Sequence, residues 1–418
     1  MILEIRFSNF FSIKDEVILD LRAGNSKSQH MKELESNVFA YKDEKILKAV
    51  AIYGANASGK SNIIKAIRFC CSMILQSHLN NENVVFLFTP FKFEGYSEKP
   101  STFSIRFVIN GIEYEYSYSL TRKMIKTESL FYYPNDRRAK VFTRDERIEG
   151  EKKDKYSFGS GIKRPMDVAE NTSDKTLFIS RASQMDRELG KEIFRFFNEQ
   201  LLLGYTGFNA PNIESLIADN KQSLIAALQI ADSDIVDIKT RKRTVPFKSV
   251  DIRLPASTAT VNDIQQEMIQ VITNHKASPG IAFDLASEES AGTKNLFMII
   301  LSLFDIVKNN KILLIDEIEL SLHSRIVEFI IKLFYISHSA QLIFTTHNTK
   351  LLDLEKIRKD QIYFVNKKPD ASTDLYSLFD YKDFRDTMDV EKAYLQGRFD
   401  AIPFVDDSIA NLKSLIHG

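Results

Sequence analysis

A chain of 418 residues is long enough for two or three domains and for a sizeable buried core. Its 44% hydrophobic and 27% charged residues are ordinary for a globular protein. Its 56 basic residues balance 56 acidic ones, so no overall field attracts nucleic acid or a membrane, and any such contact needs a local patch.

The N-terminal residues and the cysteines indicate the compartment. Residues 1–7 alternate like a strand and lack the apolar segment of a signal peptide. No apolar run approaches the length of a membrane span. Cys70 and Cys71 are neighbours in a predicted helix, where their side chains splay apart and are not expected to form a disulfide. We therefore expect a cytoplasmic protein with reduced cysteines, no zinc site and no membrane contact.

Residues 1–21 are predicted to form two strands joined by a turn at Asn9-Phe10-Phe11. Such a hairpin could lie beside a nucleotide, with Phe10, Phe11 or Lys14 near the base. The alternative, which we favour for the two phenylalanines, is an aromatic contact in the core.

The clearest motif is residues 54–61, which fit the phosphate-binding loop pattern G-x-x-x-x-G-K-[ST] at every fixed position. A short apolar run precedes this loop and apolar residues at helical spacing follow it, so the loop is predicted to join a strand to a helix. Backbone N–H groups and the helix N-terminus would then face phosphates. Lys60 would reach the β- and γ-phosphates, and the Ser61 hydroxyl would ligate Mg²⁺. The residues predicted to bind the nucleotide here are Gly54, Asn56, Ser58, Gly59, Lys60, Ser61 and Asn62.

After the helix, the pattern changes to period two. Residues 103–109 and 112–120 alternate apolar and polar side chains around Asn110-Gly111, which predicts a β-hairpin. A further strand pair is expected over 126–149, so this part of the chain is predicted to be an antiparallel β lobe.

Tyr114, Tyr116 and Tyr118 share one face of the second predicted strand. This tyrosine stripe could be a base-stacking platform, but we favour a half-buried sheet face.

The next stretch changes character twice. Residues 149–176 are polar and charged and are predicted to be a mobile loop. Residues 177–180 are predicted to be a short strand, followed by a mainly helical stretch at about 187–231 with apolar positions that suit a packed insertion. No sustained heptads are present, so no long coiled-coil arm is expected.

A basic cluster follows, consisting of Lys239, Arg241, Lys242, Arg243 and Lys248. We favour a solvated strand edge or loop for this cluster. A contact with nucleic acid or a protein partner is the alternative.

Residues 311–317 form an apolar run that ends in two carboxylates, Asp316 and Glu317. A parallel α/β sheet binds its ligand at the carboxyl ends of its strands, which is where this pair would lie. Asp316 is predicted to hold Mg²⁺ through water, and Glu317 to polarise the attacking water.

Two further motifs flank this strand. Ser290-Ala291-Gly292-Thr293 opens a predicted helix, and such an N-terminus suits a γ-phosphate, although an ordinary N-cap is the alternative. Residues 341–347 are predicted to form a strand that ends at His347, which we interpret as a γ-phosphate sensor.

This ordered set resembles the ATP-binding cassette class of ATPases, in the branch that holds structural-maintenance-of-chromosomes, double-strand-break-repair and OLD-family proteins. The resemblance implies an α/β, ABC-type P-loop ATPase fold with an antiparallel β lobe and a helical insertion. It implies that Ser290 and Gly292 are the signature motif, residues 321–323 the D-loop and His347 the switch histidine. Gln184 is the candidate Q-loop residue.

Several segments narrow the resemblance to OLD-like ATPases of bacterial abortive-infection systems, and the ATPase subunit of the PARIS anti-phage system is similar. These segments are residues 7–10, 111–118, 288–294 and 394–399. OLD nucleases carry a C-terminal Toprim domain, whereas the short remainder after His347 shows no acidic Toprim pattern. Nuclease activity of this chain is therefore not expected.

We predict an N-terminal ATPase lobe with the β subdomain over 1–180, a mainly helical insertion over 181–250, and a C-terminal ATPase lobe with a short extension over 251–418. The resemblance implies hydrolysis of ATP with Mg²⁺ between two copies of the chain, in a homodimer or higher oligomer. It further implies a sensor or scaffold role in phage defence that controls a separate effector, such as a nuclease, in response to nucleic acid or a phage protein. The alternatives are a DNA-repair or DNA-translocating ATPase, and a structural protein that binds ATP without hydrolysing it.

Overall fold

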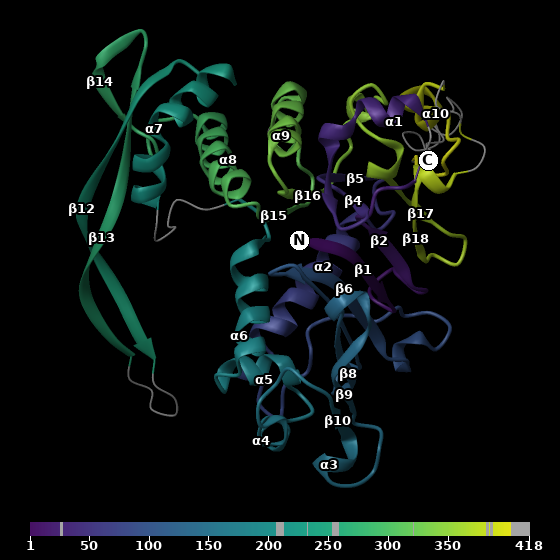
Figure 1. The fold of residues 1–418 in the computed structure, drawn as a ribbon. Helices are drawn as coiled ribbons and strands as arrows, with labels where there is room; N and C mark the ends of the chain where they lie inside the picture. The colour runs from purple at the N-terminus through teal and green to yellow at the C-terminus, as the bar shows by residue number, and fades with distance from the viewer. Residues whose placement is uncertain are drawn as a thin grey trace, which may run out of the picture. The chain divides into compact units, whose positions relative to one another are not determined.

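The computed structural model describes residues 1–25, 28–205, 213–231, 233–252, 259–320, 322–381, 384 and 388–402. By their contacts the residues form two compact units (Figure 1). Unit 1 comprises Met1–Leu203, Asn310–Glu319 and Ile331–Gly418, and unit 2 comprises Gly204–Asn309 and Leu320–Ile330. These boundaries differ from the three-part division expected from the sequence, which stays a prediction about domains.

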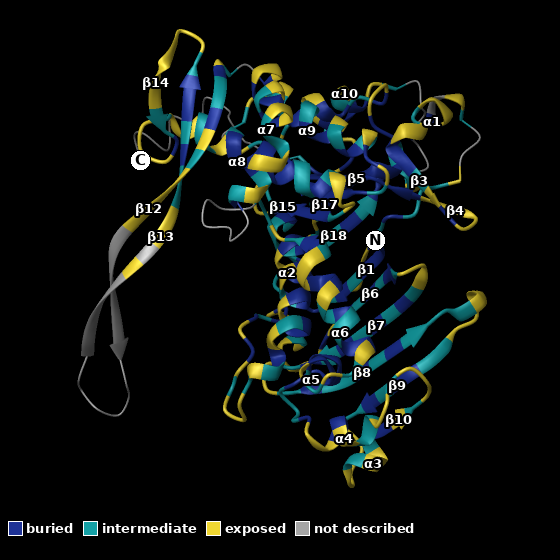
Figure 2. Ribbon diagram, turned by 60° about the vertical axis from the view of Figure 1, so that its left-hand side comes forward, coloured by how far each residue is buried: buried dark blue, intermediate teal, exposed yellow. Residues whose placement is uncertain are grey.

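A six-stranded, mainly parallel sheet forms the centre of unit 1, in the order β11-β15-β16-β5-β17-β18. Its strands are β5 (Ala49–Gly54), β11 (Leu201–Leu202), β15 (Ile312–Ile315), β16 (Gln341–Thr345), β17 (Ile362–Lys367) and β18 (Thr373–Ser377). Strands β5, β15 and β16 are buried along their whole length, as expected for parallel strands covered on both faces. Figure 2 colours the structure by burial and labels β5 and β15. The carboxyl ends of the three strands are neighbours, which confirms that the phosphate loop, the carboxylate pair and His347 follow adjacent strands.

The predicted antiparallel β lobe is confirmed as a seven-stranded sheet in the order β10-β9-β8-β7-β6-β1-β2. Its strands are β1 (Ile2–Ser8), β2 (Val17–Asp20), β6 (Ser101–Ile109), β7 (Ile112–Leu120), β8 (Ile125–Tyr132), β9 (Ala139–Asp145) and β10 (Tyr156–Phe158). Tyr114, Tyr116 and Tyr118 on β7 are all buried in the core of unit 1. The stripe is therefore a core face and not a platform for bases.

The other elements of unit 1 are short, apart from the helix after the phosphate loop. They are α1 (Gln29–Glu33), β3 (Val38–Tyr41), β4 (Glu44–Leu47), α2 (Lys60–Gln76), α3 (Lys152–Lys155), α4 (Pro165–Glu170), α5 (Phe178–Gln184), α6 (Glu188–Arg195), a π-helical turn (Phe196–Gln200) and α10 (Val390–Leu395). Cys70 and Cys71 in α2 are free and buried, and burial raises the pKa of the Cys70 thiol to about 12. Both cysteines are thus buried core residues without a disulfide, as predicted from the sequence.

The prediction of a strand over 177–180 is wrong, because this stretch starts helix α5. The carboxylate of Glu128 accepts the backbone N–H groups of Phe178 (2.7 Å) and Ile179 (3.1 Å). A buried anion at this position satisfies N–H groups that a helix leaves without a partner in its first turn. This cap comes from β8 and could not be seen in the local apolar run.

The prediction of a mobile loop over 149–176 is also wrong, since α3, β10 and α4 occupy much of it. The buried Arg144 guanidinium donates to the carbonyls of Ser173 (2.8 Å) and Thr176 (2.7 Å). Lys152 donates to the Thr172 carbonyl at 2.8 Å. Charged side chains from β9 and α3 therefore fasten a stretch whose composition alone indicates solvent exposure.

Unit 2 combines helices with a long β-ribbon. Its elements are α7 (Ile213–Ile230), β12 (Ile235–Ile252), β13 (Ala259–His275), β14 (Ser278–Asp284) and α8 (Ala291–Lys308). Helices α6 and α7 bear out the predicted helical stretch at about 187–231, but the chain over Ile235–Ile252 is strand. Helix α9 (Ser324–Ile336) starts in unit 2 and ends in unit 1.

The basic cluster lies on β12, which is an edge strand of its sheet, as we favoured from the sequence. Lys239 pairs with Asp237 (3.4 Å) and Lys242 with Glu214 (3.7 Å), and both lysines are largely exposed. The side chain of Lys248 lies outside the described residues. Among the described helices, none combines the length and the apolar composition needed to cross a membrane.

Candidate functional site

The phosphate loop has the strand–loop–helix frame that its sequence predicts. Strand β5 ends at Gly54, and α2 begins at Lys60, directly after Gly59, whose φ of 112° lies in the left-handed region. A Cβ on Gly59 would lie 2.2 Å from Thr373 Oγ1, and one on Gly54 would lie 2.6 Å from the Val365 carbonyl oxygen. Both glycines are therefore needed for the backbone to pass close to β17 and β18.

The Lys60 side chain is buried and folds back over the loop, where Nζ donates to the carbonyls of Gly54 (2.7 Å) and Ala55 (2.9 Å). Burial lowers the pKa of Lys60 to about 8, and the nearby carboxylates, chiefly Glu317 and then Asp316, oppose this shift. At neutral pH the ammonium stays mostly charged. It is a partly desolvated cation inside a loop of backbone amides, which is the environment that an incoming phosphate requires.

A chain of polar groups holds the loop from outside. The Asn62 amide donates to Ser12 Oγ (2.7 Å), Ser12 Oγ lies 2.6 Å from Thr373 Oγ1, and Thr373 Oγ1 donates to the Ser58 carbonyl (2.8 Å). The turn after β1 and the edge strand β18 thus brace the second half of the loop, where it enters α2. Ser12 and Thr373 were missed from the sequence because they are far from the loop along the chain and belong to no motif.

The carboxylate pair follows β15, as predicted. Thr345 Oγ1 donates to Asp316 Oδ1 (2.6 Å) and accepts the backbone N–H of Glu317 (2.7 Å). Glu317 has a φ of 54°, a left-handed conformation that costs a non-glycine residue free energy and that neighbours must maintain. Thr345, at the end of β16, supplies that support and directs the Glu317 side chain toward the phosphate loop.

His347 follows β16 and faces the same space. Its backbone N–H donates to Glu319 Oε1, which ties the segment after β16 to the turn after β15. The second oxygen of Glu319 is buried without a hydrogen-bond partner. Glu319 is a further residue that the sequence did not single out for this site.

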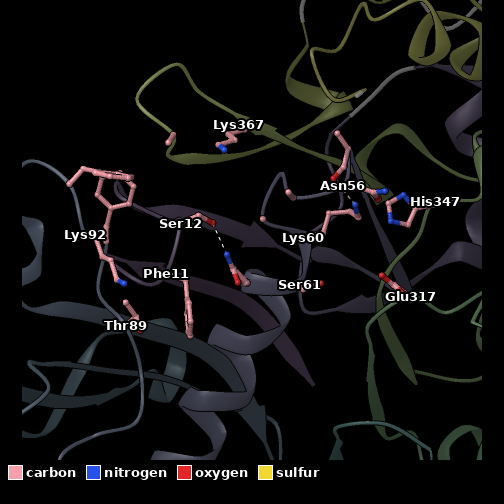
Figure 3. A pocket seen from close by; sticks show the side chains of 17 residues that line it. Phe11, Ser12, Asn56, Lys60, Ser61, Thr89, Lys92, Glu317, His347 and Lys367 are labelled. Atoms are coloured by element: carbon pink, nitrogen blue, oxygen red, sulfur yellow. Dashed lines mark hydrogen bonds between the residues drawn. The ribbon is translucent and has the colours of Figure 1, made fainter. Parts of the chain in front are cut away.

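These groups surround one cavity of about 890 Å³. Its walls come from three parts of unit 1: the phosphate loop, the turn after β1 together with the segment around residue 91, and the ends of the parallel strands. They are Phe11, Ser12, Ala55, Asn56, Ala57, Gly59, Lys60, Ser61, Asn62, Thr89, Phe91, Lys92, Phe93, Glu317, His347, Lys367 and Ala371. In Figure 3, Lys60, Ser61, Glu317 and His347 lie on one side, and Phe11 lies on the other. The volume is in the range of small-molecule and cofactor sites.

The two phenylalanines of the turn have different environments. Phe10 is buried, and its ring packs against the rings of Phe69 (5.6 Å) and Phe103 (5.6 Å), as expected for a core contact. Phe11 lines the cavity and is therefore available to a base. Lys14 is held in ion pairs with acidic side chains and does not line the cavity.

Ser61 and Asp316 are the residues that would hold Mg²⁺. The Ser61 side chain lies in the cavity wall, and Asp316 uses only Oδ1 for Thr345. No cluster of three or more His, Cys, Asp or Glu side chains suited to a metal occurs among the described residues.

The predicted signature lies in unit 2 and not in the described cavity. Ser290 is the N-cap of α8, and its Oγ accepts the N–H of Thr293 at 3.0 Å, so the ordinary N-cap is present. Gly292 is exposed, and an added Cβ would meet only Ser290 Oγ, at 3.7 Å. Of the predicted D-loop, Ser321 lies outside the described residues. Gln184 is exposed at the end of α5 and does not line the cavity.

The phosphate loop, the carboxylates and the histidine meet at one edge of a parallel sheet, and an antiparallel lobe and helices complete the fold. The predicted class is thereby confirmed: α/β, an ABC-type P-loop ATPase fold with an antiparallel β lobe and a helical insertion. Over residues 49–353 the sequence matches the family described as "AAA domain, putative AbiEii toxin, Type IV TA system", and the chain belongs to this family. A P-loop of this class implies nucleotide binding.

Comparison with curated proteins yields no match. Among solved structures, the chain is similar to an Smc head bound to the C-winged helix domain of ScpA, with 16% identity and a TM-score of 0.39 over 94% of this chain and 99% of that chain. The SMC head domain from Thermotoga maritima gives 14% identity and a TM-score of 0.36 over 90% and 98%. An Smc head with an extended coiled coil, bound to the C-terminal domain of ScpA derived from Pyrococcus furiosus, gives 14% and 0.38 over 95% and 98%.

Replacing Thr345 by valine is expected to lower ATP turnover at least about tenfold while leaving ATP affinity within about twofold. Valine keeps the shape but leaves the Glu317 N–H without its acceptor and Asp316 without its donor, a cost of roughly 1–3 kcal/mol for each buried group. Steady-state phosphate release and equilibrium ATP binding measure the two effects. Thr345→Ser keeps the hydroxyl and is the matched control. Wild-type turnover in the valine variant would remove the supporting role of Thr345.

Proposed function

We propose that this chain hydrolyses ATP with Mg²⁺ at a site that a second copy completes, and that it is the sensor or scaffold subunit of a bacterial anti-phage system. The observation that carries the ATPase part is the shared cavity, which Lys60 and Glu317 both line, Lys60 after β5 and Glu317 after β15, the two strands on either side of β16. A buried cation for phosphates opposite a carboxylate for water is the arrangement that phosphoryl transfer to water needs.

Each residue of the site has a role in this proposal. The amides of the loop and Lys60 bind the phosphates, and Phe11 lies where a base can stack. Ser61 and Asp316 hold Mg²⁺, which neutralises charge on the phosphate oxygens when it is bound. Glu317 orients and polarises the attacking water, and His347 contacts the γ-phosphate. Loss of the γ-phosphate would then remove contacts of the segments that follow β15 and β16.

The predicted signature residues are where we propose that a second copy of the chain contributes to the site. Ser290 and Gly292 are exposed at the N-terminus of the 18-residue helix α8, where the N–H groups of a first turn and the helix dipole favour an anion. No contact within the described residues requires a glycine at position 292, because the space beside it is open. A glycine is useful there if a group from another molecule comes close to the backbone. We therefore propose that Ser290 and Gly292 bind the nucleotide held by the second copy.

The role in phage defence has separate support. The description of the family names a putative toxin and a type IV toxin–antitoxin system. The motifs with a proposed role all serve the nucleotide, so we propose that the effector, such as a nuclease, is encoded separately and is held or released according to nucleotide state. Nucleic acid or a phage protein is the proposed trigger.

A DNA-repair or DNA-translocating ATPase is the rival function, favoured by Arg241 and Arg243, which are exposed two residues apart on the edge strand β12. Purification of the chain with the products of its native operon separates the two. A co-purifying effector supports defence, whereas turnover that DNA stimulates and that salt suppresses steeply supports the rival.

The composite site is tested by mixing two inactive variants. Ser290→Arg is expected to bind ATP normally in the monomer but to lose ATP-dependent association and turnover, because a bulky side chain occupies the place of the γ-phosphate. Lys60→Ala loses its own pocket but keeps Ser290. A mixed dimer contains one intact site, with Lys60 from one variant facing Ser290 from the other, so mixing should restore part of the turnover. Proven mixing without recovery contradicts the arrangement.

A further inference from the structure

A histidine between two carboxylates lies beside the signature segment in unit 2. His275, the last residue of β13, places Nδ1 2.6 Å from Asp234 Oδ1 and Nε2 2.7 Å from Glu289 Oε1. Asp234 immediately precedes β12, and Glu289 immediately precedes Ser290, the N-cap of α8. The imidazole thus joins the start of β12 and the end of β13 to the start of α8. Figure 1 labels these three elements.

Glu289 is the buried member of this group, with a side chain that is 7% exposed, against 60% for Asp234. It accepts a second hydrogen bond from Thr273 Oγ1 at 2.5 Å. The ring of Phe283 packs edge-on against the imidazole, with 4.9 Å between ring centroids. Two donors from the same strand hold this buried carboxylate in place. Loss of either hydrogen bond would leave its buried charge less well paired, which costs free energy.

We propose that His275 is a positioning residue of the ATPase: as an imidazolium it holds Glu289, and through Glu289 it sets the place of Ser290 and Gly292 for the nucleotide of the second copy. This inference rests on the proposed function, since Ser290 and Gly292 matter only if they meet a nucleotide. Glu289 and Ser290 are adjacent in the chain, so their Cα atoms are about 3.8 Å apart and a shift of one moves the other.

The charge on the ring decides how well the contact holds. Both ring nitrogens donate only in the imidazolium, so a neutral ring can serve Asp234 or Glu289 but not both. Asp234 and Glu289 are the titratable side chains that contact His275 among the described residues; Thr273 and Phe283 add no charge. The hydrogen bond to Asp234 and then that to Glu289 raise the pKa of His275 above its usual 6.5, against the opposing effect of burial.

The sign of the pH dependence follows from this shift. A raised pKa means that the contact is fully formed below pH 6.5 and is lost as the pH rises through the raised value. ATP-dependent association and turnover at saturating ATP should therefore be constant at low pH and fall about tenfold above the raised pKa, the effect of one charge-assisted hydrogen bond. Saturating ATP separates this step from the titration of Lys60, which acts on ATP affinity.

The test compares His275→Gln with wild type at saturating ATP from pH 6 to 9. Glutamine offers a donor to one carboxylate only, so association and turnover should lie at the wild-type high-pH level throughout, with ATP affinity of the monomer unchanged. His338→Gln, which changes an exposed histidine, should keep the wild-type profile. A wild-type pH step that survives in His275→Gln overturns the proposal.

Glu289→Gln provides a second variant in case His275→Gln fails to fold. Its amide oxygen can still accept from Thr273, but its lost charge should lower the pKa of His275 and move the pH step to lower values. A merely structural role would lower stability without moving the step, and an unmoved step counts against the proposal. If the wild type shows no association with ATP at any pH, the proposed function itself fails and this inference falls with it; normal association without a His275-dependent step overturns this inference alone.

Discussion

Lys60→Ala is expected to weaken ATP binding at least about 100-fold. The ammonium is the one cationic side chain among residues 54–61, and its donors bind the carbonyls of Gly54 and Ala55. Two charge-assisted hydrogen bonds from it to phosphate oxygens would be worth roughly 1.5 kcal/mol or more each. Equilibrium binding of ATP at physiological salt measures the loss. Arg68→Ala is the matched control, because it removes an exposed cation from the same helix outside the cavity.

The same lysine predicts a pH dependence of ATP affinity. Bound phosphate favours the charged ammonium and raises the pKa of Lys60 again, so binding above pH 8 must take up a proton. Affinity should be level below pH 8 and fall by up to about tenfold per pH unit above it. Wild-type affinity in Lys60→Ala, or an affinity that rises above pH 8, would contradict the assignment of the phosphate loop.

Glu317→Gln is expected to leave ATP binding intact and to lower hydrolysis by about 10²- to 10⁴-fold, the usual effect of losing a general base. The amide cannot take a proton from water, but it keeps the size of the side chain. The backbone bond from Glu317 to Thr345 is also kept, so the turn should not collapse. Oligomers that hold unhydrolysed ATP should accumulate. Comparing the size of the protein assembly in solution with and without ATP detects them.

Two outcomes decide this prediction. Glu355→Gln makes the same chemical change at an exposed position outside the cavity and should leave turnover unchanged. If Glu317→Gln hydrolyses ATP at the wild-type rate, the base is another group in the cavity wall. If Glu317→Gln loses ATP binding as well, the substitution has disturbed the turn, and Glu317→Ala is the second test. The alanine variant carries neither the charge nor the amide, and it must bind ATP and lose hydrolysis for the assignment to stand.

Local patterns were enough where the chemistry is local. The phosphate loop needs only glycines, a lysine and a hydroxyl at fixed spacing between an apolar strand and a helix, and residues 54–61 contain all of them. Asp316 and Glu317 were predictable for a similar reason, because a buried strand that ends in carboxylates delivers them to the ligand edge of a parallel sheet. The structure places Lys60, Ser61 and Glu317 in the wall of one cavity, and Thr345 binds both Asp316 and the backbone of Glu317.

Patterns failed where a distant residue decides the local structure. The apolar run 177–180 suits a strand, yet Glu128, from another strand, caps it as a helix. The polar stretch 149–176 suits a loop, yet Arg144 binds its carbonyls. In both cases, hydrogen bonds to backbone groups offset the free-energy cost of burying a charged side chain. The composition of the local segment does not reveal these bonds, because the charged residue lies elsewhere in the chain.

The sequence by itself therefore determined the class of the protein: a P-loop ATPase fold with a nucleotide motif, a carboxylate pair and a strand-end histidine in a defined order. Only the tertiary structure decided which residues support that chemistry. Thr345 holds the carboxylates, Ser12 and Thr373 brace the loop, and Phe11 rather than Phe10 faces the cavity. The physical reason is that motif residues are specified by spacing along the chain, whereas their supports are specified by hydrogen bonds and packing between strands that meet only in the folded sheet.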